Sequence, residues 1–204
     1  MIYERGIKRI LDFTFALLGL IITAIPMGIV AIAIKLESRG PVIFKQDRIG
    51  YKGKVYKMYK FRSMCVGAEK GGVYSDNTDT RVTRVGKFIR ATSIDELPQL
   101  VNVLKGDMAL IGFRSPLTYH PWPWSEYSKE QKKMFNVRPG ITGWAQVNGR
   151  KTVEWNRRIE LNVWYAEHVS FLLDLKILFL TVYKVLANAD NENTGETVTE
   201  KKNK

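Results

Sequence analysis

The sequence predicts a mostly helical α+β protein, with one long N-terminal membrane helix followed by a small domain that contains short strands. Two observations lead to this fold class. Residues 10–34 form a 25-residue apolar run whose only charged residue is Asp12. Later segments combine short strand-like runs with amphipathic helical patterns. The chain has 204 residues, of which 45% are hydrophobic and 25% charged, which suits one folded domain with an appended element.

The apolar run is long enough to enter a bilayer. A helix over it would measure about 37 Å at about 1.5 Å per residue, against a hydrocarbon core of about 30 Å. The run is too long for the core of a signal peptide, and no small-residue cleavage site follows it. Apolar residues surround the helix instead of forming one stripe, which disfavours a buried helix of a soluble core. The sequence therefore predicts a membrane element.

Pro26 divides this apolar run, and proline kinks or breaks a helix. Basic residues flank the run on both sides, with Lys8 and Arg9 before it and Lys35 and Arg39 after it. Because basic flanks favour the cytoplasmic side, a helix that turns back at Pro26 and re-enters the same leaflet would keep both flanks there. A kinked helix that spans the bilayer is the alternative.

The chain divides into three parts. Residues 1–36 hold the membrane helix, residues 37–187 the main domain, and residues 188–204 a polar tail that is expected to be disordered. The strongly basic start of the domain suits contact with anionic lipid head groups, although a solvated basic face would have the same composition.

Short runs between turn residues give the expected elements of the domain. Two strands are expected over residues 42–45 and 55–59, with Gly50 and Gly53 in the turn between them. Helices are expected over residues 84–91, 93–104, 128–137, 152–168 and 171–186. The last of these is strongly apolar but carries charges, so it suits packing on the core or lying at a membrane interface.

Charge and composition exclude some functions. The net charge of +12 implies an acidic partner, which could be nucleic acid, an anionic membrane or a phosphate-bearing substrate. The long apolar run disfavours nucleic acid. Cys65 is the only cysteine, so no internal disulfide can form, and the two histidines have no zinc-ligand spacing.

Asp95 and Glu96 are the first candidate catalytic residues. Ser93 and Glu96 have the spacing of a capping box, which places both carboxylates at a helix start. This setting is expected to lower the pKa of a carboxyl group and keep it ionised. Such a carboxylate can act as a nucleophile or bind a divalent cation, but ordinary helix capping is the alternative.

Basic residues near turns form the second candidate set. Arginine on a rigid loop suits bidentate phosphate binding, whereas a surface salt bridge is the alternative role of each one. The set consists of Lys60, Arg62, Arg90, Arg114 and Arg138.

Several segments, taken in order, resemble the monotopic phosphoglycosyl transferases, also called the bacterial sugar transferase family. They are Lys8-Arg9 with Asp12, Pro26 in the apolar run, GPVIFKQDRIG, KMYKFRSM, SIDELPQLVNVLKGDMALIG, VRPGITGWAQVNGR and FLLDLKIL. Each segment alone is weak, but together they cover residues 8–186 and are highly specific. The compact length resembles the minimal, single-domain form of the family.

The resemblance implies an enzyme on the cytoplasmic face of the bacterial inner membrane. It would be monotopic, with a re-entrant helix broken at Pro26 and with amphipathic helices at the interface. It would transfer a sugar 1-phosphate from a UDP-sugar to polyprenyl (undecaprenyl) phosphate, releasing UMP, as the first membrane step of a surface glycan pathway. Anionic lipids and pathway glycosyltransferases are further partners that the resemblance suggests.

The resemblance also implies residue roles. Asp95 would attack the donor to give a phosphosugar-aspartyl intermediate, and Glu96 would orient it or help to bind Mg²⁺, so both carboxylates are also expected metal ligands. The cationic set would bind substrate phosphates. The membrane helix would be marked by Lys8, Arg9, Asp12 and Pro26.

Two positions depart from the family pattern. Gly112-Phe113-Arg114-Ser115-Pro116 stands where the family usually has Gly-Pro-Arg-Pro, and Asn162 stands where an aspartate is common. The alternative function, on the residues alone, is a non-catalytic basic membrane scaffold that binds anionic lipid or a partner enzyme.

Overall fold

The computed structural model describes residues 3–72, 79–149 and 154–187, so the tail predicted to be disordered, residues 188–204, lies outside the described part. The helices are α1 Lys8–Glu37, α2 Arg84–Ala91, α3 Gln99–Lys105, α4 Lys129–Lys132, α5 Trp144–Val147, α6 Trp155–Glu167 and α7 Phe171–Leu186. The strands are β1 Ile43–Ile49, β2 Val55–Phe61, β3 Ala109–Ile111 and β4 Gly140–Thr142. The predicted fold class, mostly helical with a few short strands, is confirmed.

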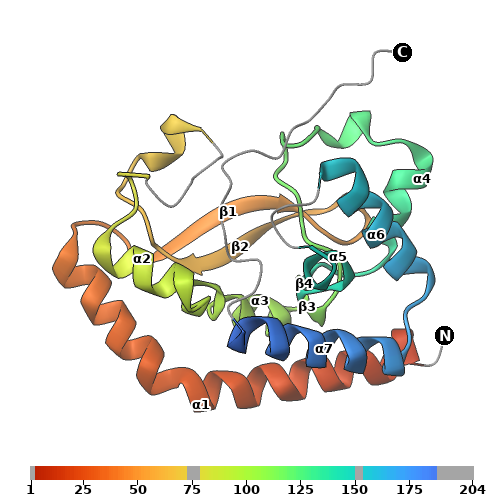
Figure 1. Ribbon diagram of the computed structural model, residues 1–204, viewed down its shortest axis with the longest axis horizontal. Coiled ribbons are helices and arrows are strands. Elements are labelled where there is room, and N and C mark those ends of the chain that lie inside the picture. Colours follow the sequence, from red (N-terminus) through yellow and green to blue (C-terminus); the bar gives the residue numbers. More distant parts are fainter. Residues whose placement is uncertain (1–2, 73–78, 150–153, 188–204) are drawn as a thin grey trace.

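The N-terminal helix α1 lies along one side of the domain (Figure 1). It has 30 residues and is long and apolar enough to cross a membrane. The helix continues through Pro26, so the predicted break at this residue is not confirmed. Figure 1 shows a bend near the middle of α1. A bend is the expected consequence of an internal proline, because proline lacks the backbone donor of the helical ladder.

Both ends of α1 are bonded to the same domain. Near the start, the Arg9 guanidinium donates to the carbonyl oxygen of Val103 at 2.7 Å. Near the end, the buried guanidinium of Arg62 donates to the carbonyl oxygen of Ser38 at 2.8 Å. The Glu37 carboxylate accepts from the first backbone N–H groups of α2. These contacts hold the two ends of the helix against one body.

Small residues of α1 let it pack closely on α3. Ala16 is fully buried against Leu100 and its neighbours. A methyl group on Gly19 would lie 3.3 Å from Leu100 Cδ1, so this position also needs a small residue. The contact face is one side of a helix whose other sides are largely exposed, with Ile22 at 76% and Ile25 at 78%.

The antiparallel hairpin of β1 and β2 confirms the two predicted strands. Its turn contains Lys52 and Gly53, both with positive φ. At Gly53, where φ is +77°, an added Cβ would lie 2.7 Å from the Trp124 ring, so both the backbone conformation and the space require glycine.

The parallel pair β3 and β4 was not predicted. Each strand has only three residues, which is too short for an alternating pattern to be recognised. The strands meet where Gly112 and Gly140 pack backbone against backbone, since a Cβ on either would collide with the other chain segment. This junction carries the chain directly to Arg114.

The C-terminal half is built on helices α6 and α7. The predicted bounds of the last helix, residues 171–186, are confirmed, and the preceding helix begins at Trp155. Residues 128–137 form α4 and a following 3-10 turn, Lys133–Asn136. The core between these elements centres on buried Phe113, Phe135 and Tyr165.

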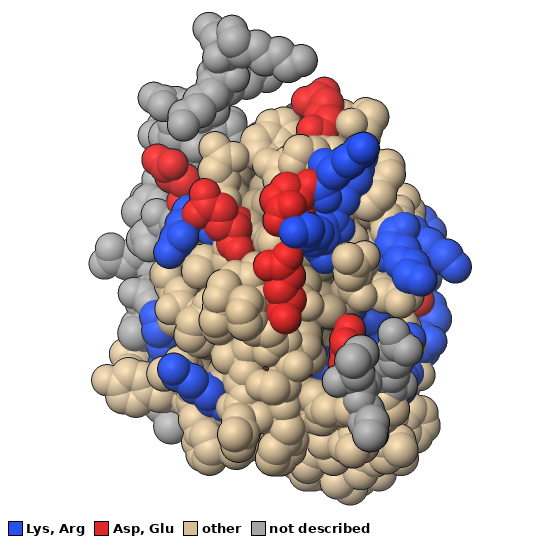
Figure 2. All heavy atoms as spheres, turned by 90° about the vertical axis from the view of Figure 1, so that its right-hand side faces the viewer, with Lys and Arg blue, Asp and Glu red and all other residues tan. Residues whose placement is uncertain are grey.

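One side of the molecule is poor in charge. Helix α7 lies beside α1 in Figure 1 and exposes Leu172 at 75% and Phe179 at 67%. In Figure 2, Lys, Arg, Asp and Glu gather mainly in the upper half of the face, whereas the lower part is mostly uncharged. The exposed apolar residues of α1 and α7 therefore lie toward the same side, as expected for a membrane-facing surface.

Candidate active site

Asp95 and Glu96 lie in a 3-10 turn, Ile94–Glu96, between α2 and α3. The prediction of one helix from Ser93 is wrong at its start, because α3 begins only at Gln99. Ser93 adopts left-handed backbone angles, φ 59° and ψ 15°, and its side chain makes no capping hydrogen bond. The predicted capping box is therefore absent, and the turn presents both carboxylates apart from the helix.

Lys60 lies between the two carboxylates. Its Nζ is 2.7 Å from Glu96 Oε1 and 4.0 Å from Asp95 Oδ2. Arg114 Nη2 approaches the same Glu96 oxygen at 3.5 Å. The Lys60, Asp95 and Glu96 side chains are only 14–21% exposed, so these charges interact more strongly than a pair on the open surface would.

Asn102 places Lys60 against the turn. Its side chain accepts a hydrogen bond from Tyr59 N at 2.9 Å and donates to Lys57 O at 2.8 Å. This fully buried amide joins α3 to the backbone of β2, one residue before Lys60. The sequence analysis missed Asn102, although a lone amide in the apolar segment QLVNVLK was a usable signal.

The loop that carries Arg114 is held on both sides. Arg48 donates to Ser115 O at 2.8 Å, and Ser115 Oγ donates to Ile49 O at 2.7 Å. Phe113 is fully buried in the core. Phe113 and Ser115 stand where the resemblance leads us to expect proline, but burial of Phe113 and the contacts of Ser115 to β1 restrain the loop. Arg48, which belongs to the segment GPVIFKQDRIG but was not among the predicted site residues, thus supports the site.

The two carboxyl groups have different electrostatic environments. Burial is the largest effect on each and raises the pKa. For Glu96, Lys60 and Arg114 outweigh burial and lower the pKa to about 2. For Asp95, burial together with the Glu96 charge prevails over Lys60, so the pKa lies above its ordinary value. The prediction that a helix start lowers the pKa is therefore wrong for Asp95. The pKa of Glu96 is lowered, but by neighbouring cations.

The structure brings together some of the predicted cations and not others. Lys60 and Arg114 contact the carboxylates, and the positive charge of Arg90 opposes the rise in the Asp95 pKa. In the described part of the chain, Arg62 and Arg138 form no ion pair with either carboxylate. Arg62 bonds the end of α1, and Arg138 Nε donates to the Gly106 carbonyl oxygen at 3.0 Å.

The residues predicted to mark the membrane helix contact the domain. Lys8 Nζ lies 2.6 Å from Asp174 Oδ2, and the Asp12 carboxylate accepts from Leu110 N at 2.9 Å. Asp174 belongs to α7 and Leu110 to β3. The start of α1 is therefore bonded to α7 and to β3.

The carboxylate pair fits one mode of magnesium binding. The described ranges hold no cluster of three or more His, Cys, Asp or Glu side chains. Magnesium is commonly held by one or two carboxylates together with substrate phosphates and water. Asp95 and Glu96 provide two hard oxygen donors beside phosphate-attracting cations, so their chemistry suits an ion shared with a substrate phosphate.

Comparison with known families gives one match over nearly the whole chain. The sequence profile described as "Bacterial sugar transferase" matches residues 3–188. This range includes every candidate site residue described above.

Individual relatives agree with this match. The chain is 44% identical to "Uncharacterized sugar transferase EpsL" of Bacillus subtilis (strain 168), covering 96% of this chain and 95% of that protein. It is 42% identical to "UDP-glucose:undecaprenyl-phosphate glucose-1-phosphate transferase" of Escherichia coli (strain K12), covering 91% of this chain. It is also 42% identical to "Galactosyl transferase CpsE" of Streptococcus agalactiae serotype III (strain NEM316), covering 88%. The alignments span only 41% and 42% of the last two proteins.

Proposed function

The chain belongs to the bacterial sugar transferase family, and from this premise we propose that it transfers a sugar 1-phosphate from a UDP-sugar to undecaprenyl phosphate. The products are UMP and an undecaprenyl diphosphate sugar, which begins a surface glycan. The carboxylate pair held by Lys60 and Arg114 is the observation that carries this proposal. The same type of reaction is in the name of the relative from Escherichia coli.

In the first step, an Asp95 carboxylate oxygen attacks the β-phosphorus of the donor. A new oxygen–phosphorus bond forms, and the bond from this phosphorus to the bridging oxygen breaks. The bridging oxygen leaves with UMP. The sugar phosphate remains on Asp95 as an acyl phosphate. Lys60 and Arg114 lie where they can neutralise the phosphate oxygens during the attack.

In the second step, undecaprenyl phosphate takes the sugar phosphate. An oxygen of the lipid phosphate attacks the same phosphorus, and the bond to the Asp95 oxygen breaks, which restores the carboxylate. Both substrates are anionic, so the same cations serve both steps.

The environments of the two carboxylates favour Asp95 as the nucleophile. A carboxylate with a raised pKa is the more basic and hence the more nucleophilic of the pair. Glu96, with a pKa of about 2 and short contacts to cations, stays ionised and orients Lys60 and Arg114. Asp95 and Glu96 would hold Mg²⁺, which supplies charge neutralisation at the diphosphate.

We further propose that α1 is re-entrant, with both ends on the cytoplasmic face of the inner membrane. Arg9 bonds the end of α3 and Arg62 bonds the end of α1, so both ends contact the domain that carries the site. A helix that crossed the bilayer would have to release one of these sets of contacts. The bend in α1 would let its middle enter the leaflet beside α7 (Figure 1).

Cysteine labelling tests this topology. In a Cys65→Ser background, cysteines at the exposed positions Glu4 and Arg39 should both react with a membrane-impermeant maleimide only after the cells are permeabilised. Labelling of one position from outside intact spheroplasts would instead support a spanning helix.

Release of UMP by the detergent-solubilised protein tests the reaction. A panel of UDP-sugars with magnesium should give release that depends on undecaprenyl phosphate for at least one sugar, and Asp95→Asn should abolish it while membrane binding is retained. Turnover by Asp95→Asn would refute the nucleophile. An inactive wild-type protein that still binds membranes would support the scaffold function.

A further inference from the structure

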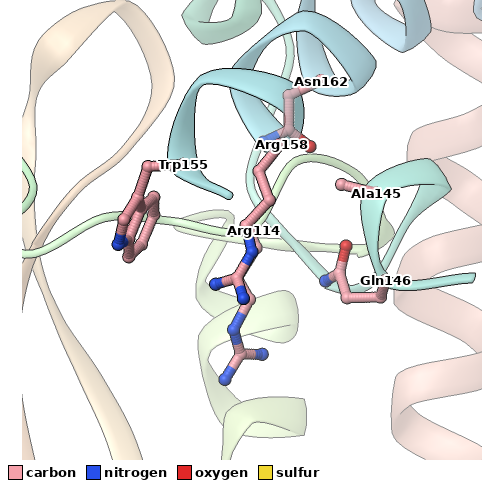
Figure 3. A pocket seen from close by; sticks show the side chains of 6 residues that line it. All are labelled: Arg114, Ala145, Gln146, Trp155, Arg158 and Asn162. Carbon is pink, nitrogen blue, oxygen red and sulfur yellow. The ribbon is translucent and has the colours of Figure 1, made fainter. Parts of the chain in front are cut away.

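A narrow pocket lies beside Arg114, between α5 and α6 (Figure 3). It has room for a group about the size of one water molecule. Its walls come from the loop after β3, from α5 and from one face of α6, where residues three and four positions apart are neighbours. The lining residues are Arg114, Ala145, Gln146, Trp155, Arg158 and Asn162.

Several polar atoms of this pocket are buried without a hydrogen-bond partner among the residues that the structure describes. They are both amide atoms of Gln146, the indole Nε1 of Trp155 and the amide oxygen of Asn162. Asn162 is only 4% exposed. Buried polar groups are normally satisfied, and leaving one unpaired is costly. Because both donors and acceptors are unsatisfied, the pocket fits a small group that can donate and accept.

The pocket also adjoins the proposed phosphate site. Arg114 lines it and approaches Glu96 at 3.5 Å. Figure 3 shows the Arg158 side chain pointing from α6 toward Arg114, with Trp155 on one side and Gln146 on the other. Among the described residues, the pocket lining includes two arginines and no acidic side chain. Arginine is suited to binding phosphate oxygens. A group bound in this pocket would therefore belong to a molecule that carries a phosphate ester.

We propose that this pocket takes one ring hydroxyl of the nucleotide-sugar donor and thereby selects among donors. A hydroxyl both donates and accepts hydrogen bonds, which matches the unpaired atoms, whereas an ionised phosphate oxygen only accepts. The hydroxyl belongs either to the sugar that is transferred or to the ribose of the nucleotide. This inference rests on the proposed transferase reaction and adds a specificity determinant that includes Gln146, Trp155 and Asn162.

The expected selectivity has a physical basis. A site whose buried polar groups pair with a substrate hydroxyl discriminates against an analogue that lacks it, because those groups then remain unpaired. The loss of one such hydrogen bond corresponds to about a tenfold change in kcat/KM.

The aromatic loop that includes Trp122 and Trp124 is a weaker candidate for donor recognition, because these rings pack against Tyr127 and Phe135.

The test compares deoxygenated donors in the wild-type protein and in Gln146→Leu. The donors are the best UDP-sugar from the panel, its analogues lacking single sugar hydroxyls, and its 2′-deoxyuridine form. Asn162→Leu is a second variant, in case Gln146→Leu folds poorly, and Asn148→Leu is the matched control, because Asn148 is exposed in the turn that follows α5. The readouts are kcat and KM for UMP release and the affinity for UDP and UDP-sugars by calorimetry.

With the wild-type and control proteins, kcat/KM for one analogue should be about tenfold lower than for the full donor. With Gln146→Leu, the same analogue and the full donor should give nearly equal kcat/KM. If that analogue lacks a sugar hydroxyl, UDP affinity should be unchanged by the substitution. If it is the 2′-deoxyuridine form, UDP affinity should fall as well. If every analogue lowers kcat/KM by the same factor in the wild-type protein and in Gln146→Leu, the inference is wrong and the pocket binds only water.

The failure of this inference can be separated from failure of the reaction. If the wild-type protein releases UMP but Gln146→Leu changes the response to no analogue, the transferase reaction is supported and the hydroxyl-binding role of the pocket is refuted. If the wild-type protein releases no UMP from any donor, the reaction fails. The calorimetric comparison then tests the pocket separately. If Gln146→Leu leaves the affinities for UDP-sugars and for UDP unchanged, the proposed role of the pocket is refuted.

Discussion

At the scale of single residues, Lys60 links the two carboxylates of the site. It is 2.7 Å from Glu96 and 4.0 Å from Asp95. Its charge helps to lower the pKa of Glu96 and opposes the rise in the pKa of Asp95. The sequence alone placed Lys60 in a run of basic residues and could not separate it from Arg62. The tertiary structure separates them, because one points to the carboxylates and the other to the end of α1.

Replacing Lys60 tests this role. Lys60→Met keeps the length of the side chain but removes its charge, and should reduce kcat/KM for UMP release by about 100-fold, the size seen when one transition-state donor is lost. Lys60→Arg should retain more activity, because the charge remains. A loss of less than threefold in a folded Lys60→Met protein would contradict the role.

Glu96 should contribute to stability in a way that depends on pH. Its pKa falls from 4.5 in the unfolded chain to about 2 in the fold. The ionised form therefore stabilises the fold fully above about pH 4.5, and this contribution is lost as the pH falls toward about 2. Denaturant unfolding should show that Glu96→Gln lowers the free energy of unfolding at pH 6 and that the difference shrinks by pH 3.

The exposed carboxylate of Glu130 provides the control for this measurement. Glu130→Gln should change the free energy of unfolding little at either pH, since exposed ion pairs are weak. A Glu96→Gln difference that stays constant from pH 6 to pH 3 would show that the pair with Lys60 does not stabilise the fold.

At the scale of elements, α3 and the β1–β2 hairpin position the site together. The sequence predicted the hairpin correctly, because turn glycines and a β-rich composition are local signals. It merged the carboxylate turn with α3, because Ser93 and Glu96 have the spacing of a capping box. The left-handed angles of Ser93 are a tertiary outcome that the spacing does not reveal.

Asn102 is the connection between α3 and β2, and its loss should weaken the fold. Asn102→Ala leaves Tyr59 N and Lys57 O without their buried partner. The expected cost is about 2–3 kcal/mol of unfolding free energy, measured by denaturant unfolding in detergent. Val101→Ala, at a half-exposed position on the same helix, should cost less. Equal costs would mean that the two bonds contribute little.

At the scale of the whole molecule, one buried carboxylate joins the N-terminal segment to the C-terminal helices. Asp174 on α7 accepts from Tyr3 Oη at 2.7 Å, Lys8 Nζ at 2.6 Å and Tyr165 Oη at 2.6 Å. It is 4% exposed. The sequence showed Asp174 only as a charge on an amphipathic helix, since its partners Tyr3 and Lys8 are 171 and 166 positions away.

Removing this carboxylate should destabilise the whole protein. Asp174→Ala leaves the Lys8 charge in a buried setting, which costs about 3–5 kcal/mol when a buried pair is broken. The loss should appear as a lower thermal unfolding temperature in detergent. The double variant Lys8→Met/Asp174→Ala should cost less than the sum of the two single variants, because no unpaired charge remains. Strict additivity would contradict the pairing.

The sequence by itself determined the long apolar N-terminal helix, the hairpin, the bounds of α2 and α7, and the identity of Asp95, Glu96, Lys60 and Arg114 as site candidates. These follow from local signals, namely apolar run length, turn residues, helical periodicity and an ordered set of motifs. Only the tertiary structure decided that Arg62 bonds α1, that Asp95 has a raised pKa, and that Gln146 and Asn162 meet beside Arg114. Those results depend on burial and on contacts between distant segments, and no local pattern records how the chain brings such segments together.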